Sequence, residues 1–180
     1  MTTWRALAIT TIVVLGACYN AGPYGYDRHY VPLDFEEDLA ENAQEAVFNE
    51  VRTDPEDFGN TLISWFGVVE QVSPGEGGAS LIRLSFRNHQ ERHLCFEEER
   101  STCRVTVSQA SAGTFTARVH LRPEDQSGQN SVGAGSLLRV YCHVTGEYDA
   151  EGGPLLDCES YRHWPRGQWA HTGMRGRMRR

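Results

Sequence analysis

The sequence predicts a mainly β fold, in which a small five-stranded barrel is preceded by one amphipathic α-helix. Two observations lead to this prediction. Apolar residues recur at every fourth position between residues 34 and 54, which is the period of a helix. From residue 61 onward the chain instead carries short runs rich in β-branched and aromatic residues. Segments containing glycine separate these runs, which is typical of consecutive strands.

The first 17 residues predict the signal peptide of a bacterial lipoprotein. Arg5 precedes an apolar run over residues 6–17, which is too short to span a bilayer, because a spanning helix needs about 20 apolar residues. The run ends in the pattern Leu-Gly-Ala-Cys, which matches a lipobox and makes the thiol of Cys18 the acceptor of the lipid. The alternative is an ordinary signal peptide that is followed by an incidental cysteine.

The lipobox also predicts a location. Tyr19 follows the cysteine, where an aspartate would signal retention in the inner membrane of enteric bacteria. We therefore expect the protein at the cell outer membrane, facing the periplasm, with membrane lipid as its partner through acylated Cys18. Each buried methylene contributes about 0.8 kcal/mol, so several acyl chains on one residue hold the protein firmly.

The rest of the chain is long enough for one domain. Residues 18–33 carry Gly, Pro and Tyr without periodicity, which predicts a flexible lipidated tether. The domain is expected over residues 34–165, and residues 166–180 form an arginine-rich tail. This tail can lie on anionic headgroups, lie on the acidic helix of the same molecule, or be disordered. The net charge of −7 argues against a nucleic-acid partner.

Residues 34–54 predict the amphipathic helix. Asp34 can cap its start with Glu37 three positions on, as in a capping box, and Pro55 ends it. The acidic residues of this segment are interpreted as its solvated face, against the alternative of an acidic docking surface. The apolar stripe of the helix consists of Phe35, Leu39, Ala43, Val47 and Val51.

Five strands are expected after this helix, and a polar segment between the second and third can add a short hairpin. Gly67, within the first strand, predicts a bulge or a sharp bend, and residues 122–136 predict a long loop. A bent first strand in a small domain suits a closed or nearly closed barrel of the OB type. The expected strands cover residues 61–72, 79–87, 113–121, 137–146 and 154–164.

The stretch "TDPEDFGNTLISWFGVVEQV" resembles the start of the Slp family of starvation-inducible outer-membrane lipoproteins, and the similarity extends over residues 47–165. Ser64 and Phe66 replace an arginine and a glycine of the family's first strand, and residues 88–112 do not match. The resemblance implies a structural or stress-related envelope role and supplies no catalytic residues. The positions that match the family's opening motif are Pro55, Phe58, Trp65, Gly67 and Val68.

Four cysteines besides Cys18 are interpreted as two disulfides, because these predominate in an oxidising compartment. Zinc and free thiols are the alternatives, although the spacings differ from the two to four residues that zinc ribbons use. The expected hairpin of the last two strands places Cys142 opposite Cys158. The remaining disulfide then joins Cys95 to Cys103 and closes a polar segment.

No catalytic residue, metal or cofactor is expected. His89 and His93 are four residues apart, but Gln90 follows the first histidine where the zincin motif requires glutamate. A hydrolase that uses these two histidines and a nearby carboxylate is the enzymatic alternative. Three further histidines lie singly on expected strands and are interpreted as packed or exposed imidazoles, namely His120, His143 and His163.

The function expected from these features is that of a structural or interaction module of the outer membrane. The first alternative is a periplasmic lipoprotein that binds a ligand or glycan. Exposure of Trp65 or Tyr141 in a concave groove would favour it, whereas burial of both in the barrel core would not. The second alternative is an accessory subunit of an envelope complex, with an envelope protein as its partner.

Overall fold

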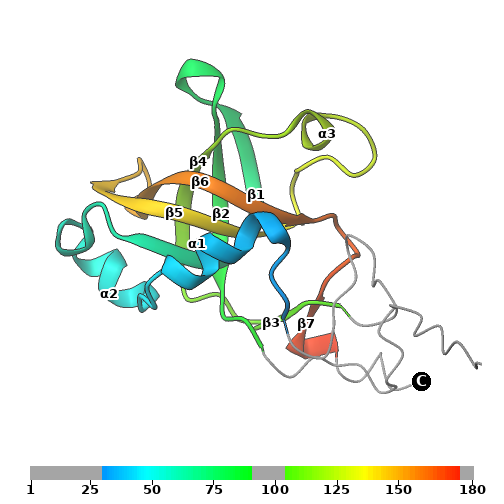
Figure 1. Cartoon of the computed structure of the whole chain (residues 1–180), viewed down its shortest axis with the longest axis horizontal. Coiled ribbons are helices and arrows are strands. Elements are labelled where there is room, and N and C mark those ends of the chain that lie inside the picture. Colours follow the sequence, from blue (N-terminus) through cyan, green and yellow to red (C-terminus); the bar gives the residue numbers. More distant parts are fainter. Residues whose placement is uncertain (1–29, 91–103, 175–180) are drawn as a thin grey trace, which may run out of the picture.

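A computed structural model describes residues 30–90 and 104–174 (Figure 1). The described chain folds into a closed barrel of five strands in the order β1-β2-β4-β6-β5. All neighbouring strands in the barrel run antiparallel, except that β4 and β6 are parallel. The prediction of a small, mainly β barrel of the OB-like kind, preceded by a helix, is therefore confirmed.

Each barrel strand forms close to where the sequence predicts it. A separate pair of short parallel strands, β3 (Thr106–Val107) and β7 (Ala170–His171), lies outside the barrel (Figure 1). The barrel strands are β1 (Leu62–Pro74), β2 (Ser80–Arg87), β4 (Thr114–Val119), β5 (Leu137–Tyr148) and β6 (Pro154–Trp164).

Gly67 lies where β1 passes from its pairing with β5 to its pairing with β2. The bulge expected at this glycine is absent there, because the register of β1 with β2 shifts between Val69 and Gln71 instead. The glycine serves close packing: a Cβ at this position would lie 2.8 Å from Cβ of Leu84 and 3.1 Å from Cε1 of Phe115.

The predicted helix over residues 34–54 is broken in its middle. The chain is extended between the two α-helices, since the backbone N–H of Gln44 donates to the carbonyl of Leu62 at 2.9 Å. The carbonyl of Ala46 likewise accepts the indole N–H of Trp65 at 3.0 Å. These bonds replace helical ones. The α-helices are α1 (Glu37–Asn42), α2 (Phe48–Thr53) and α3 (Pro123–Gln126), and 3₁₀ turns lie at Asp34–Glu36, Pro55–Phe58, Glu76–Gly78 and Thr172–Met174.

The break also changes which apolar residues are buried. Phe48 and Val51 of α2 lie in the core, whereas Phe35 and Val47 remain exposed, so the four-residue stripe does not form one buried face. α1 crosses the outside of the barrel (Figure 1). The hydrogen bonds to β1 therefore stabilise this segment more than a continuous helix would, because a short helix gains little stability from its own propensity.

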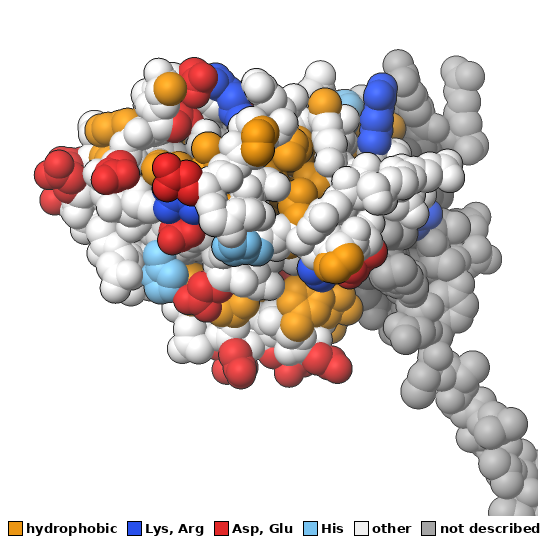
Figure 2. Space-filling view, turned by 90° about the horizontal axis from the view of Figure 1, so that it is seen from above, with side chains coloured by type: hydrophobic (Ala, Val, Ile, Leu, Met, Phe, Trp, Pro, Cys, Tyr) orange, Lys and Arg blue, Asp and Glu red, His pale blue; other side chains and the backbone are white. Residues whose placement is uncertain are grey.

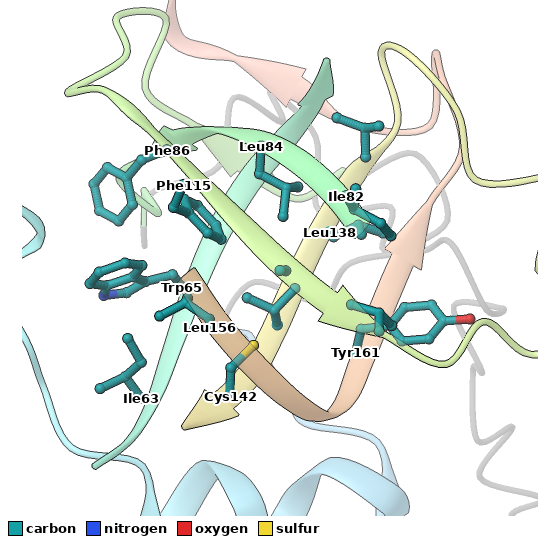
Figure 3. Packing of buried hydrophobic residues seen from close by; sticks show 14 of the residues in the cluster. Ile63, Trp65, Ile82, Leu84, Phe86, Phe115, Leu138, Cys142, Leu156 and Tyr161 are labelled. Atoms are coloured by element: carbon teal, nitrogen blue, oxygen red, sulfur yellow. The ribbon is translucent and has the colours of Figure 1, made fainter. Parts of the chain in front are cut away.

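Large apolar side chains fill the interior of the barrel (Figure 3). Trp65 lies 5.4 Å from the rings of both Phe86 and Phe115, in edge-to-face contacts that tie β1 to β2 and β4. A second, smaller cluster covers part of the outside of the barrel and includes Val107 of β3. Its buried members are Phe66, Val105, Val107, Leu137 and Trp164.

The described part of the expected tail packs against this second cluster. The indole N–H of Trp169 donates to the carbonyl of Gly135 at 3.0 Å. The backbone N–H of Ala170 donates to the carbonyl of Val105 at 2.9 Å, which places residues 166–174 within the fold. Residues 175–180 lie outside the described chain.

Candidate functional site

A fully buried carboxylate, that of Glu36, attaches the N-terminal segment to the barrel. One of its oxygens accepts hydrogen bonds from the hydroxyls of Tyr30 and Tyr141, the latter at 3.0 Å. The other oxygen accepts from the backbone N–H of Leu33 at 2.9 Å and from Nη1 of Arg162 at 3.1 Å. The charge is thus neutralised within the fold.

Local structure explains why the side chain of Glu36 turns inward. It lies in the first turn of the helical segment and accepts the N–H of Leu33, the residue that precedes the turn. The expected capping pair of Asp34 and Glu37 is therefore wrong by one position. A carboxylate at the start of a helix satisfies a free N–H and favours the helix dipole.

Cations and phenols surround the Glu36 carboxylate. The guanidinium of Arg162 lies 5.3 Å from the ring of Tyr30, and that of Arg139 lies 4.5 Å from the same ring. Burial raises the pKa of Tyr30 to about 12 and also raises the pKa of Tyr141. Both phenols therefore stay protonated at physiological pH and can donate to the carboxylate.

A second buried polar cluster lies at the base of the long loop. Asp125 of α3 accepts hydrogen bonds from the hydroxyl of Tyr161 at 2.6 Å and from Nε of Arg122 at 3.1 Å. Nδ1 of His163 lies 2.7 Å from Asp125, and its Nε2 lies 3.1 Å from Oγ of Ser136. Aspartate, histidine and serine thus follow one another in the order of a catalytic triad.

The surroundings of Ser136 do not suit a nucleophile. A nucleophilic serine needs its Oγ open to substrate and donors placed for the oxyanion. Ser136 is only 2% exposed, and its Oγ also accepts the backbone N–H of Gly133 at 3.3 Å. The cluster instead fastens the loop over residues 122–136 to the end of β6. These bonds explain why the segment is ordered without a large apolar core of its own.

Hydrogen bonding controls the ionisation of Asp125. Burial alone would raise its pKa, but the bonds from His163 and Tyr161 and the nearby Arg122 outweigh burial and lower the pKa to about 2. The carboxylate is therefore ionised throughout the physiological range, and its charge stabilises the folded loop.

Trp65 and Tyr141 are both buried, so neither is exposed in the way that the ligand-binding alternative requires. Trp65 is 3% exposed and packs in the barrel core, with one edge in the wall of a pocket beside the barrel. Tyr141 is fully buried beneath the N-terminal segment, where its hydroxyl is bound to Glu36. The exposure of these two residues therefore does not favour the ligand-binding alternative, although Trp65 contributes to the wall of that pocket.

The predicted disulfide between Cys142 and Cys158 is confirmed. The two residues are paired across β5 and β6 with their Cα atoms 3.8 Å apart, and Cys142 is fully buried in the core. The predicted lipidation site Cys18 and the predicted pair Cys95 and Cys103 lie outside the described residues.

The candidate histidines are dispersed. His89 stacks on Phe66 with ring centroids 4.8 Å apart, and His93 lies outside the described residues. Nε2 of His143 lies 2.5 Å from Glu159, and this bond raises the pKa of the imidazole. In residues 30–90 and 104–174, no three His, Cys, Asp or Glu side chains gather as metal ligands.

The buried clusters gave little signal in the sequence. Glu36 stands in an acidic run that reads as a solvated face, and Asp125 stands in a loop 38 positions before His163. The one available hint was an arginine next to a histidine, Arg162 and His163, within the last expected strand. Adjacent ionisable residues on such a strand need partners, and these come from distant segments.

No protein-family model matches the chain, and a search of curated proteins also finds no match. Among the described residues, no helix is long and apolar enough to cross a membrane. The resemblance to the Slp family therefore stays a prediction.

Proposed function

We propose that this chain is a lipoprotein of the bacterial cell envelope, anchored by lipid on Cys18, whose barrel serves as a structural or interaction module at the outer membrane. The observation that carries the proposal is the Leu-Gly-Ala-Cys pattern at the end of a short apolar run. The resemblance of residues 47–165 to the Slp family supports the same address.

The disulfide between Cys142 and Cys158 supports an oxidising compartment, such as the periplasm. Both buried carboxylate clusters also support a structural role, because Glu36 and Asp125 accept hydrogen bonds from other residues of the same domain. We therefore infer that the barrel has a structural role or binds another envelope component, and that it does not catalyse a reaction.

The docked N-terminal segment limits how far the barrel can lie from the membrane. Tyr30 is attached to the barrel through Glu36. About twelve residues separate it from Cys18, so the fully extended connection spans at most about 40 Å, and a flexible one about 20 Å on average. Three apolar side chains on the attached segment are exposed, namely Val31, Leu33 and Phe35.

The surface fits a contact module better than a nucleic-acid binder. Figure 2 shows one face on which acidic side chains lie mainly along the edge, with hydrophobic side chains exposed among uncharged ones. An envelope protein is the proposed partner. The net charge of −7 gives little attraction for a phosphate backbone.

Replacement of Cys18 tests the anchor. We expect Cys18→Ala to abolish labelling with radioactive palmitate and to leave uncleaved precursor, whereas the wild-type chain should carry the label and be cleaved. Membrane association of the wild-type protein should also resist high salt, because acyl insertion is not screened. Normal cleavage and membrane retention of the Cys18→Ala protein would refute lipid anchoring at Cys18. Full release of the wild-type protein from membranes by salt would instead indicate that the arginine-rich tail attaches it.

A further inference from the structure

A pocket of about 330 Å³ lies beside the barrel, between the extended chain that follows α1 and the adjoining ends of β1 and β2. Trp65, Phe66 and Phe86 supply apolar wall, and Glu45 is the one carboxylate among the described residues that line the pocket. Two arginines also line it, Arg87 at the end of β2 and Arg139 on β5. The described lining therefore combines apolar surface with more positive than negative side chains.

The two arginines flank one residue of the sheet. Phe66 of β1 is paired with Arg87 on β2 and with Arg139 on β5. Residues paired across neighbouring strands share a face, and adjacent strands lie about 4.8 Å apart, so the two arginine backbones are about 10 Å apart. Two side chains as long as arginine can converge on one anion over that distance.

Among the described residues, neither arginine has a carboxylate partner. Nε of Arg139 donates to Oγ of Ser64 at 2.8 Å, and its guanidinium lies 4.5 Å from the ring of Tyr30, 4.8 Å from that of Tyr141 and 5.5 Å from that of Phe66. Arg162, the next residue across the sheet from Arg139, differs because it is paired with Glu36. Of this row, Arg162 has an ion pair, whereas Arg87 and Arg139 have none among the described residues.

Arg87 is the less satisfied of the pair. Its Nη1 donates to the carbonyl of Gln109, while its Nε is buried without a hydrogen-bond partner in the described structure. Burial lowers the pKa of its guanidinium, and the charge of Glu70 offsets part of this effect. A cation that loses water without gaining an anion is costly, and a bound anion would remove that cost.

We propose that this pocket binds a small organic acid, whose carboxylate is held between Arg87 and Arg139 and whose apolar body lies against the aromatic wall. Guanidinium groups bind carboxylates through paired, charge-assisted hydrogen bonds, so the recognition is directional. Glu45 is exposed at the pocket and weakens the attraction. The inference does not depend on the lipid anchor, and failure of either leaves the other standing.

Benzoate, with neutral benzamide as its matched control, probes the site in the full chain purified in a neutral detergent. We expect calorimetry to show saturable binding of benzoate at one site and much weaker binding of benzamide. Arg87→Gln and Arg139→Gln should each weaken benzoate binding about tenfold or more, because each removes a charge-assisted contact. Glu45→Gln should tighten it about two- to fivefold, since it removes a repulsive charge.

Arg118→Gln is the control, because Arg118 lies on β4 outside the pocket, with Asp157 at 3.8 Å. It should leave benzoate affinity unchanged. Circular dichroism establishes that each variant folds, and Arg87→Lys replaces Arg87→Gln if the latter does not. Absence of saturable benzoate binding, equal binding of benzamide, or unchanged affinity in both pocket variants would each overturn the proposal.

Discussion

The carboxylate of Glu36 and Nη1 of Arg162 lie 3.1 Å apart and are both buried, although 126 positions separate them in the chain. This pair joins the segment after the predicted tether to the last barrel strand. A buried pair of this kind is costly to break, because the remaining partner keeps an uncompensated charge.

Glu36→Gln should therefore lower the free energy of unfolding by about 3 kcal/mol, measured by urea denaturation. Arg162→Met should have a similar effect, and the double variant should lose less than the sum of the two. Amide hydrogen exchange should rise in the docked residues 30–36 of either variant, which separates loss of docking from general destabilisation.

The matched control for that pair is an exposed one. Arg83 lies 3.3 Å from Glu70 and 3.0 Å from Glu151 with much of each side chain in solvent. Arg83→Met should cost less than about 1 kcal/mol. Equal losses for Arg83→Met and Glu36→Gln would contradict the importance assigned to the buried pair.

The disulfide between Cys142 and Cys158 should be a large part of the stability of this small barrel. It closes a sequence separation of 16 residues, which corresponds to about 3 kcal/mol in the chain-entropy model. Urea denaturation with and without reductant, in a chain carrying Cys95→Ser and Cys103→Ser, measures this contribution alone. The same midpoint in both conditions would show that the disulfide adds nothing.

Gly67 should not tolerate a side chain. Gly67→Ala places a Cβ 2.8 Å from Cβ of Leu84, and such overpacking in a barrel core costs about 1–3 kcal/mol. Gly133→Ala is the control, because a Cβ there has no neighbour within 4 Å, and it should change stability by less than about 0.5 kcal/mol. Thermal denaturation of the two variants side by side gives the comparison.

Acid should weaken the fold through Asp125. Its folded pKa of about 2 lies below its ordinary value of 3.8, so its contribution is complete above about pH 4 and is lost as the pH falls toward 2. The loss over this window should be about 2 kcal/mol. Urea denaturation across this range should show a shallower pH dependence for Asp125→Asn. Asp157→Asn, at an exposed carboxylate, should retain the wild-type slope.

The strands could be predicted because alternation and β-branched residues mark a half-buried sheet wherever it pairs. Pairing of Cys142 with Cys158 followed from the same hairpin, since facing positions are set by its turn. The helix over residues 34–54 could not be placed correctly, because Gln44 and Ala46 bind β1 rather than their own helix. No local pattern encodes that competition.

The candidate sites were harder to predict for the same reason. Glu36 contacts Arg162, and Asp125 contacts His163, only because the closed barrel brings distant segments together. The row of Arg87, Phe66 and Arg139 likewise depends on strand register across three separate stretches of chain. Single-sequence patterns describe neighbours along the chain, whereas these groups are neighbours across the sheet.

The intact mass of the protein extracted from membranes tests the central claim, that the barrel is anchored by lipid, most directly. The predicted mature chain begins at Cys18, lacks residues 1–17 and carries a diacylglyceryl group on its thiol. Fragmentation should place the added mass on the N-terminal cysteine. A mature chain that begins at another residue, or one with an unmodified Cys18, would contradict the account.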